Sequence, residues 1–224
     1  MSGQVFNLIE PVSKKDRIID AIKGAALSGK VAPGEAIVES KVAQQLGVGT
    51  PLVREALIEL EHQGFVQRVP FKGTYVTKLS RRDVEKIFRL RAELEALAIE
   101  WAKANVTPED IKELRGLIER MRKGAKELNL DQFYECDLAF HRKIWEMSDN
   151  PYLVEALERV VVPLFAFFLM KMHRQREAYV ESAALHGRIV DGLATLSAPG
   201  LRKLMKESLT GWKAEMLNKL FAAE

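Results

Sequence analysis

Apolar and polar positions follow two different patterns along the chain. Up to about residue 78, short apolar stretches are separated by turn residues such as Gly29, Gly47 and Gly64. Beyond that point, apolar residues recur every three or four positions over long stretches, which is the pattern of amphipathic helices. The sequence therefore predicts two domains, residues 1–78 and residues 79–224.

The first domain is predicted to contain three helices followed by two strands. Helical apolar spacing and the glycines after it place two helices at Lys14–Leu27 and Glu39–Leu46, and a third from about Thr50 or Pro51 to His62. Two β-favouring runs follow, Phe65–Val69 and Thr74–Thr77, and Pro70–Gly73 joins them. Three helices and a β-hairpin wing make a winged helix-turn-helix.

The second domain is predicted to be an all-α bundle of about six helices. A strong helix start lies at Thr107, which offers an N-cap hydroxyl before Pro108 and two acidic residues in the first turn. The periodicity places the helices at Arg82–Ala104, Pro108–Glu127, Asp131–Met147, Pro151 to about His173, Glu177–Leu196 and Pro199–Phe221. The predicted fold class is therefore mainly α.

Composition favours a folded protein of the cytoplasm. The 224 residues carry 34 Lys and Arg against 31 Asp and Glu, and 47% are apolar, which is enough to bury a core. Cys136 is the only cysteine, so an intrachain disulfide is excluded and a reducing compartment is expected. No secretory signal is apparent at the N-terminus. We expect no membrane contact, because the most apolar stretch, Val160–Met172, is shorter than the roughly 20 residues of a membrane helix.

Three segments of the first domain keep a distinctive order and spacing: GKVAPGE at residues 29–35, ESKVAQQLGV at 39–48 and VREAL at 53–57. They resemble the DNA-binding domain of the GntR family of bacterial transcription regulators. In the second domain, three further features resemble the FadR-type branch of that family, which has a helical FCD effector domain. These features are Arg91-x-x-Leu94-Glu95, Asp137-x-x-x-His141-Arg142 and His186.

The resemblance implies a set of DNA-contacting residues. Arg54 falls in the first two turns of the third helix, where a guanidinium can bind a guanine edge or a phosphate; a surface ion pair with a nearby acid is the alternative. Many relatives have an arginine where this chain has Thr50, which cannot make a bidentate guanine contact, so we expect a different operator. The rest of the expected DNA-facing set is Lys41, Arg68, Lys72 and Gly73. A solvated hairpin turn explains Lys72 equally well.

The net charge of the first domain does not by itself indicate DNA binding. Residues 1–78 contain ten Lys and Arg and eight Asp and Glu, a net of +2. One winged helix contacts few phosphates, whereas a dimer engages two half-sites at once. Since the family dimerises chiefly through its effector domain, we expect a homodimer on a pseudo-palindromic site in double-stranded DNA.

Asp137 and His141 are four residues apart and therefore share one face of a helix. By itself this pair is most often a surface hydrogen bond. In the resembling family, such a pair meets two later histidines around a divalent metal ion. His186 matches the first of them, but Ser208 stands where the second is expected. We expect a weakened site made by Asp137, His141 and His186, with Zn, Ni, Mn and Fe not distinguished, or a cavity without metal.

Arg91 and Ser208 are the candidate ligand-binding residues. The resemblance implies that Arg91 points into the effector cavity, where a guanidinium opposite a metal ion suits a carboxylate. A structural ion pair with Glu95, four residues later, is the alternative. Ser208 either orients a bound water molecule or simply fills space.

Three functions remain open at this point. The leading hypothesis is a transcription regulator, with repression the commoner sign in the family, that responds to a small carboxylate metabolite. An architectural DNA-binding dimer with a degenerate, metal-free pocket is the second. A metal-dependent enzyme is the third, and the chain lacks the phosphate loop, nucleophile elbow and HExxH motif that would favour it.

Overall fold

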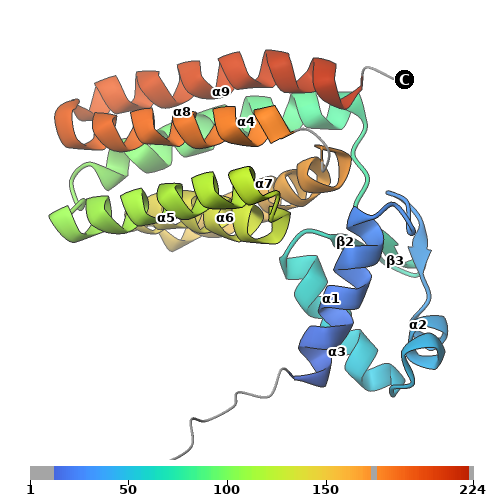
Figure 1. The fold of residues 1–224 in the computed structure, drawn as a ribbon. Helices are drawn as coiled ribbons and strands as arrows, with labels where there is room; N and C mark the ends of the chain where they lie inside the picture. Colours follow the sequence, from blue (N-terminus) through green and yellow to red (C-terminus); the bar gives the residue numbers. More distant parts are fainter. Residues whose placement is uncertain (1–12, 173–175, 222–224) are drawn as a thin grey trace, which may run out of the picture. The chain divides into compact units, whose positions relative to one another are not determined.

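A computed structural model describes residues 13–172 and 176–221 (Figure 1). Contacts between Cα atoms divide the chain into two compact units, Met1–Val76 and Thr77–Glu224. None of the described helices has both the length and the apolar run that a bilayer crossing requires.

The first unit is a winged helix-turn-helix, as predicted. Its sheet has the strand order β1-β3-β2 with both pairs antiparallel, and Val69 of β2 faces Gly73 of β3 at the tip of the hairpin. The sequence pattern missed β1, which has only two residues and pairs Ala36 with Tyr75. The elements are α1 Lys14–Leu27, β1 Ala36–Ile37, α2 Glu39–Leu46, α3 Thr50–His62, β2 Val66–Val69 and β3 Gly73–Val76.

Local signals and a small apolar core fix the helices of this unit. Ser13 caps α1 by accepting a hydrogen bond from the amide of Asp16. Gly47 ends α2 in the left-handed region at a φ of 64°, where glycine is favoured, and the chain then turns into α3. The apolar faces of α1 and α3 meet in the core through Ile18, Ile22, Val53, Leu57 and Leu60.

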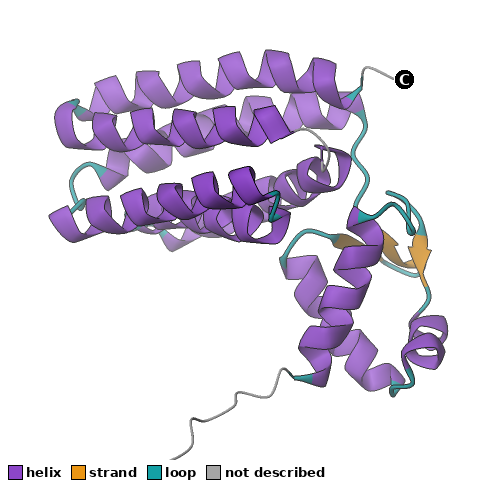
Figure 2. Cartoon of the chain, in the orientation of Figure 1, coloured by secondary structure: helices purple, strands orange, loops and turns teal. Residues whose placement is uncertain are grey.

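The second unit consists of six helices joined by short loops in its described part (Figure 2). They are α4 Arg81–Ala102, α5 Pro108–Glu127, α6 Leu130–Glu146, α7 Pro151–Met172, α8 Arg176–Thr195 and α9 Ala198–Leu220. The predicted bounds differ from these by at most two residues, except that the predicted end of the fourth of these helices, at about His173, lies outside the described residues. The all-helical prediction for this unit is confirmed.

The packing of the six helices places α4 along α9, and α5 against both α6 and α8 (Figure 1). Capping boxes start α4 at Ser80 and α5 at Thr107, in each case with an aspartate three residues later that bonds back to the cap. Trp145 and Phe140 of α6 are fully buried in the core. Because α4, α6 and α8 are held from several sides, side chains that point inward from them have fixed positions.

Candidate functional site

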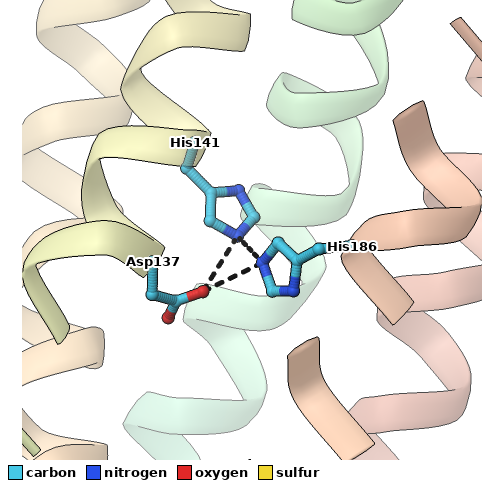
Figure 3. A group of neighbouring side chains, drawn as sticks. All are labelled: Asp137, His141 and His186. Carbon is cyan, nitrogen blue, oxygen red and sulfur yellow. Dashed lines mark hydrogen bonds and ion pairs between the residues drawn. The ribbon is translucent and has the colours of Figure 1, made fainter. Parts of the chain in front are cut away.

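Three potential metal ligands from two helices meet inside the second unit (Figure 3). Asp137 and His141 come from successive turns of α6, and His186 comes from α8. The Nε2 atom of His186 lies 2.9 Å from Oδ1 of Asp137 and 3.2 Å from Nε2 of His141. Nε2 of His141 lies 3.9 Å from Oδ1 of Asp137. The two histidines are 4% and 5% exposed, so the cluster is a buried one.

The contacts of the two Nδ1 atoms indicate which tautomer each imidazole adopts when neutral. Nδ1 of His186 lies 2.6 Å from the carbonyl oxygen of Ser182 and can only donate to it, which leaves the lone pair on Nε2. Nδ1 of His141 lies 3.2 Å from Oε2 of Glu95, and the carboxylate favours a proton at Nδ1 there as well. In the neutral rings that metal binding requires, both Nε2 lone pairs would face the Asp137 carboxylate.

The donor atoms fit a divalent metal ion. Metal–ligand bonds of about 2.1 Å place neighbouring ligand atoms about 3.0 Å apart in an octahedron and about 3.4 Å apart in a tetrahedron. The separations of 2.9, 3.2 and 3.9 Å lie around these values. Oδ1 of Asp137 is buried, and its closest polar neighbour in the cluster is Nε2 of His186 at 2.9 Å. A cation bound between three electron-pair donors that face one another stabilises such an arrangement.

The charge of Asp137 suits the same role. Burial by itself raises the pKa of this carboxyl, but His186, His141 and Arg91 nearby outweigh that effect, so the pKa lies below its usual value. Asp137 is therefore ionised at neutral pH. A carboxylate oxygen together with two imidazole nitrogens is a ligand set used by several divalent transition metals.

Glu95 is a site residue that the sequence analysis considered only as an ion-pair partner. It is completely buried on α4, accepts a 2.8 Å hydrogen bond from Nε of Arg91, and lies beside His141. Burial raises its pKa, but Arg91 and His141 overcome this and lower it to about 2. Its carboxylate therefore holds the His141 ring from behind, as carboxylates commonly do for metal-binding histidines.

Arg91 makes the ion pair with Glu95 and also borders the cavity beside the cluster. Its Nε edge is in the ion pair with Glu95, whereas Nη2 lies 3.4 Å from Nε2 of His141. The guanidinium also stacks over Phe165, 4.6 Å from the ring centroid, and lines the cavity beside the cluster. The structural ion pair is thus present, and the same side chain borders the space in front of His141.

The cavity beside the cluster has a volume of about 40 Å³. An ion and one or two water molecules fit in such a space. Its apolar wall includes Phe165, Met205 and Leu209, and its polar wall includes Ser208 of α9. The Ser208 hydroxyl oxygen is buried and has no hydrogen-bond partner among the described residues. It is therefore placed where it can bond to a group that enters the cavity.

The first unit presents its candidate DNA residues mainly at the surface. Thr50 is exposed at the first turn of α3, and Arg54 lies one turn later with 60% of its side chain exposed. Nη2 of Arg54 lies 2.9 Å from Oε2 of Glu39 on α2. The ion pair that was the alternative for Arg54 is thus present, but its acid comes from α2 and not from α3. Lys41, Lys72 and Gly73 are exposed, and Arg68 lies 3.8 Å from Glu61.

Family models match both units. The model described as "Bacterial regulatory proteins, gntR family" matches residues 14–76, and the one described as "FCD domain" matches residues 86–211, more than half of the chain. The chain belongs to the GntR family and carries an FCD domain. Both parts of the resemblance noted in the sequence are therefore confirmed.

Curated relatives of this GntR-family protein are regulators. The HTH-type transcriptional regulator McbR of Escherichia coli is 31% identical over 134 residues, 60% of this chain and 61% of the relative. The HTH-type transcriptional repressor RspR of the same species is 28% identical over 130 residues, 58% and 57% of the two chains. The aligned stretch thus spans less than two thirds of either relative. Both relatives are named as transcriptional regulators.

Solved structures agree with the GntR-family fold. E. coli McbR/YncC superposes with a TM-score of 0.71 at 24% identity, covering 94% of this chain and all of the other. A GntR-type regulator from Rhodococcus sp. RHA1 gives 0.65 at 16% identity, with 94% and 99% covered. At this level of identity the likeness concerns the fold alone.

Proposed function

We propose that the protein is a DNA-binding transcriptional regulator of the cytoplasm, a repressor, whose FCD domain senses a small organic acid through a divalent metal ion. Asp137, His141 and His186 would hold the ion. The observation that carries the proposal is their convergence, with both Nε2 atoms and a carboxylate oxygen facing one another beside a cavity that Arg91 borders. When bound, the ion would supply a Lewis acid that attracts a carboxylate oxygen.

The formal charges of the site favour a monoanion. Asp137, Glu95 and Arg91 together carry a charge of −1, and a divalent ion raises it to +1. One carboxylate group then restores neutrality in a buried site, where an uncompensated charge is costly. The Nη edge of Arg91 and the hydroxyl of Ser208 are the hydrogen-bond donors placed to hold such a group.

The small cavity suggests how ligand binding alters the rest of the protein. An acid larger than about two water molecules requires Met205 and Leu209 of α9 to move, because they line the cavity. Helix α9 packs along α4, and ion pairs such as Glu93–Lys206 at 2.6 Å join the two. Only four residues separate the end of β3 in the first unit from the start of α4. A shift of α9 therefore reaches the connection to the DNA-binding unit.

A homodimer on a pseudo-palindromic operator fits the surface of α4. Ile87, Leu90, Leu94, Leu97 and Trp101 lie on one face of this helix, and none of them is fully buried. Leu90 and Trp101 are 47% and 40% exposed. A second copy that covers this face would bring two winged helices to two half-sites.

The proposed function is tested by selecting DNA from a randomised duplex library with the purified protein. We expect enrichment of a two-fold symmetric site at moderate salt, and we expect a panel of small carboxylic acids, assayed with Ni²⁺ or Zn²⁺ present, to contain one that releases the DNA. Thermal unfolding of the protein with metal alone gives an independent readout. Failure to enrich any duplex would refute the DNA-binding role.

A second candidate is a DNA-binding dimer with a metal-free pocket, which Ser208 favours because it removes one expected ligand. This alternative predicts the same selected duplex. It also predicts no rise in melting temperature with Ni²⁺, Zn²⁺, Mn²⁺ or Fe²⁺ and no release of DNA by any acid. An Asp137→Asn variant is the control, since it should abolish any metal-dependent rise that the wild type shows.

A further inference from the structure

An aromatic side chain stands at the tip of the wing in the first unit. Phe71, between β2 and β3, is the most exposed large apolar side chain of the described residues, at 108%. It also has a φ of 62°, in the left-handed region that non-glycine residues avoid. Both its exposure and its backbone conformation are unfavourable in the isolated unit, so contact with another molecule is the natural compensation.

The loop that carries Phe71 is held in place by its own hydrogen bonds. Val69 pairs with Gly73 across the hairpin, and the amide of Lys72 donates to the carbonyl of Val69 at 3.0 Å. The hydroxyl of Tyr75 donates to the carbonyl of Lys72 at 3.1 Å. The exposed ring therefore stands on a defined three-residue loop, residues 70–72, that joins the paired strands.

The charges around Phe71 indicate which partner covers it. The hairpin, residues 66–76, contains the cations Arg68 and Lys72 and no acidic residue. A protein surface that is apolar at its tip and cationic at its flanks matches a nucleic acid, where apolar base faces lie between two rows of phosphates. The same unit carries α3, the helix expected to enter the major groove.

We propose that Phe71 inserts into the DNA minor groove beside the half-site and wedges partly between two stacked base pairs. This inference rests on the proposed DNA-binding function and adds an apolar contact to it. Partial unstacking is least costly at flexible pyrimidine–purine steps, so the wing selects a TA or CA step at its position although it forms no base-specific hydrogen bond.

The test compares wild type, Phe71→Ala, Lys72→Ala and Tyr152→Ala on the duplex that the wild type selects. Tyr152 is the matched control, since it is an aromatic residue of the second unit with 82% exposure. We expect Phe71→Ala to weaken binding about 10-fold, within the range of losing one base–aromatic contact, without changing the salt dependence. Lys72→Ala should lower the slope of log Kd against log salt by about one, as for a lost phosphate contact. Tyr152→Ala should change neither.

A spectroscopic readout identifies the wedge directly. With 2-aminopurine in place of adenine at the flanking steps, the wild type should raise the fluorescence at one step on each side of the site, and Phe71→Ala should not. Unchanged melting of Phe71→Ala verifies its folding, and Phe71→Gly, which relaxes the φ of 62°, should bind as weakly as Phe71→Ala. Equal affinity or equal fluorescence for wild type and Phe71→Ala overturns the inference, as does a salt slope lowered as in Lys72→Ala. If the wild type selects no duplex, the proposed function fails instead.

Discussion

Replacing Glu95 by glutamine tests the buried network that joins α4 to the candidate metal site. The carboxylate is completely buried, accepts a hydrogen bond from Arg91 at 2.8 Å and lies 3.2 Å from Nδ1 of His141. Glutamine keeps the size of the side chain but removes its charge. The Arg91 guanidinium is then buried beside a neutral amide, and His141 loses the group that favours a proton on Nδ1.

The size of the effect follows from the pKa of Glu95. Burial raises this pKa, but Arg91 and His141 lower it to about 2, against 4.5 ordinarily. At about 1.4 kcal/mol per pKa unit, the ionised carboxylate contributes about 3 kcal/mol to the free energy of unfolding. Because the pKa is depressed in the folded state, this contribution is complete above pH 4.5 and is lost as the pH falls towards 2. Wild type and Glu95→Gln should therefore differ most at neutral pH and converge in acid.

Urea unfolding at pH 7, followed by circular dichroism, measures the loss. The control is Glu93→Gln, two residues earlier on α4, because Glu93 pairs with Lys206 while 56% of its side chain remains exposed. Such a surface pair contributes at most about 1 kcal/mol. Metal titration of Glu95→Gln should show an affinity about 10- to 100-fold below that of the wild type. Equal stability of the two glutamine variants would refute the assigned role of Glu95.

Three further outcomes follow from other contacts. Glu39→Ala removes the acid 2.9 Å from Arg54. At low salt it should tighten binding to random DNA by about two- to threefold and reduce the preference for the selected site. Weaker binding to both kinds of DNA would contradict this expectation. Ser208→His should strengthen metal binding in titration calorimetry, and an unchanged affinity would show that position 208 does not face the ion. Asp110, whose pKa is lowered to about 2 by hydrogen bonds from Lys143 and Thr107, should stabilise the fold above pH 4 and lose this effect as the pH falls towards 2. Asp110→Asn should therefore flatten the acid limb of the unfolding curve, whereas an unaltered limb would argue against it.

Most of the helices were predictable because their signals are local. The predicted bounds of α1, α2 and α5 equal the observed ones, since caps such as Ser13 and Thr107 and the C-terminal Gly47 act within a few residues. Strand β1 was missed, because its two residues become a strand only through pairing with β3. No periodicity within a short window encodes such a contact.

The metal cluster was predictable only in part, for the same reason. The spacing of Asp137 and His141 places them on one helix face, but the approach of His186 depends on how α6 and α8 pack around α5. The link from Glu95 to His141 spans 46 positions and has no local pattern. The pairing of Arg54 with Glu39 likewise crosses the turn between α2 and α3. An acid near Arg54 was expected, but the sequence pointed to acids on the same helix as Arg54.

The serine at position 208 and the small cavity bear on the same question, namely how an acid reaches the metal position. A third imidazole, as a fourth ligand, would occupy a coordination position and part of the 40 Å³ space, whereas the buried hydroxyl of Ser208 leaves both open. A site with three protein ligands binds its ion more weakly but keeps positions for an incoming carboxylate. Ser208→His should therefore act in opposite directions, strengthening metal binding and weakening the response to the acid. Because Met205 and Leu209 lie on the same helix as Ser208, this opposition would also locate the ligand-dependent movement in α9.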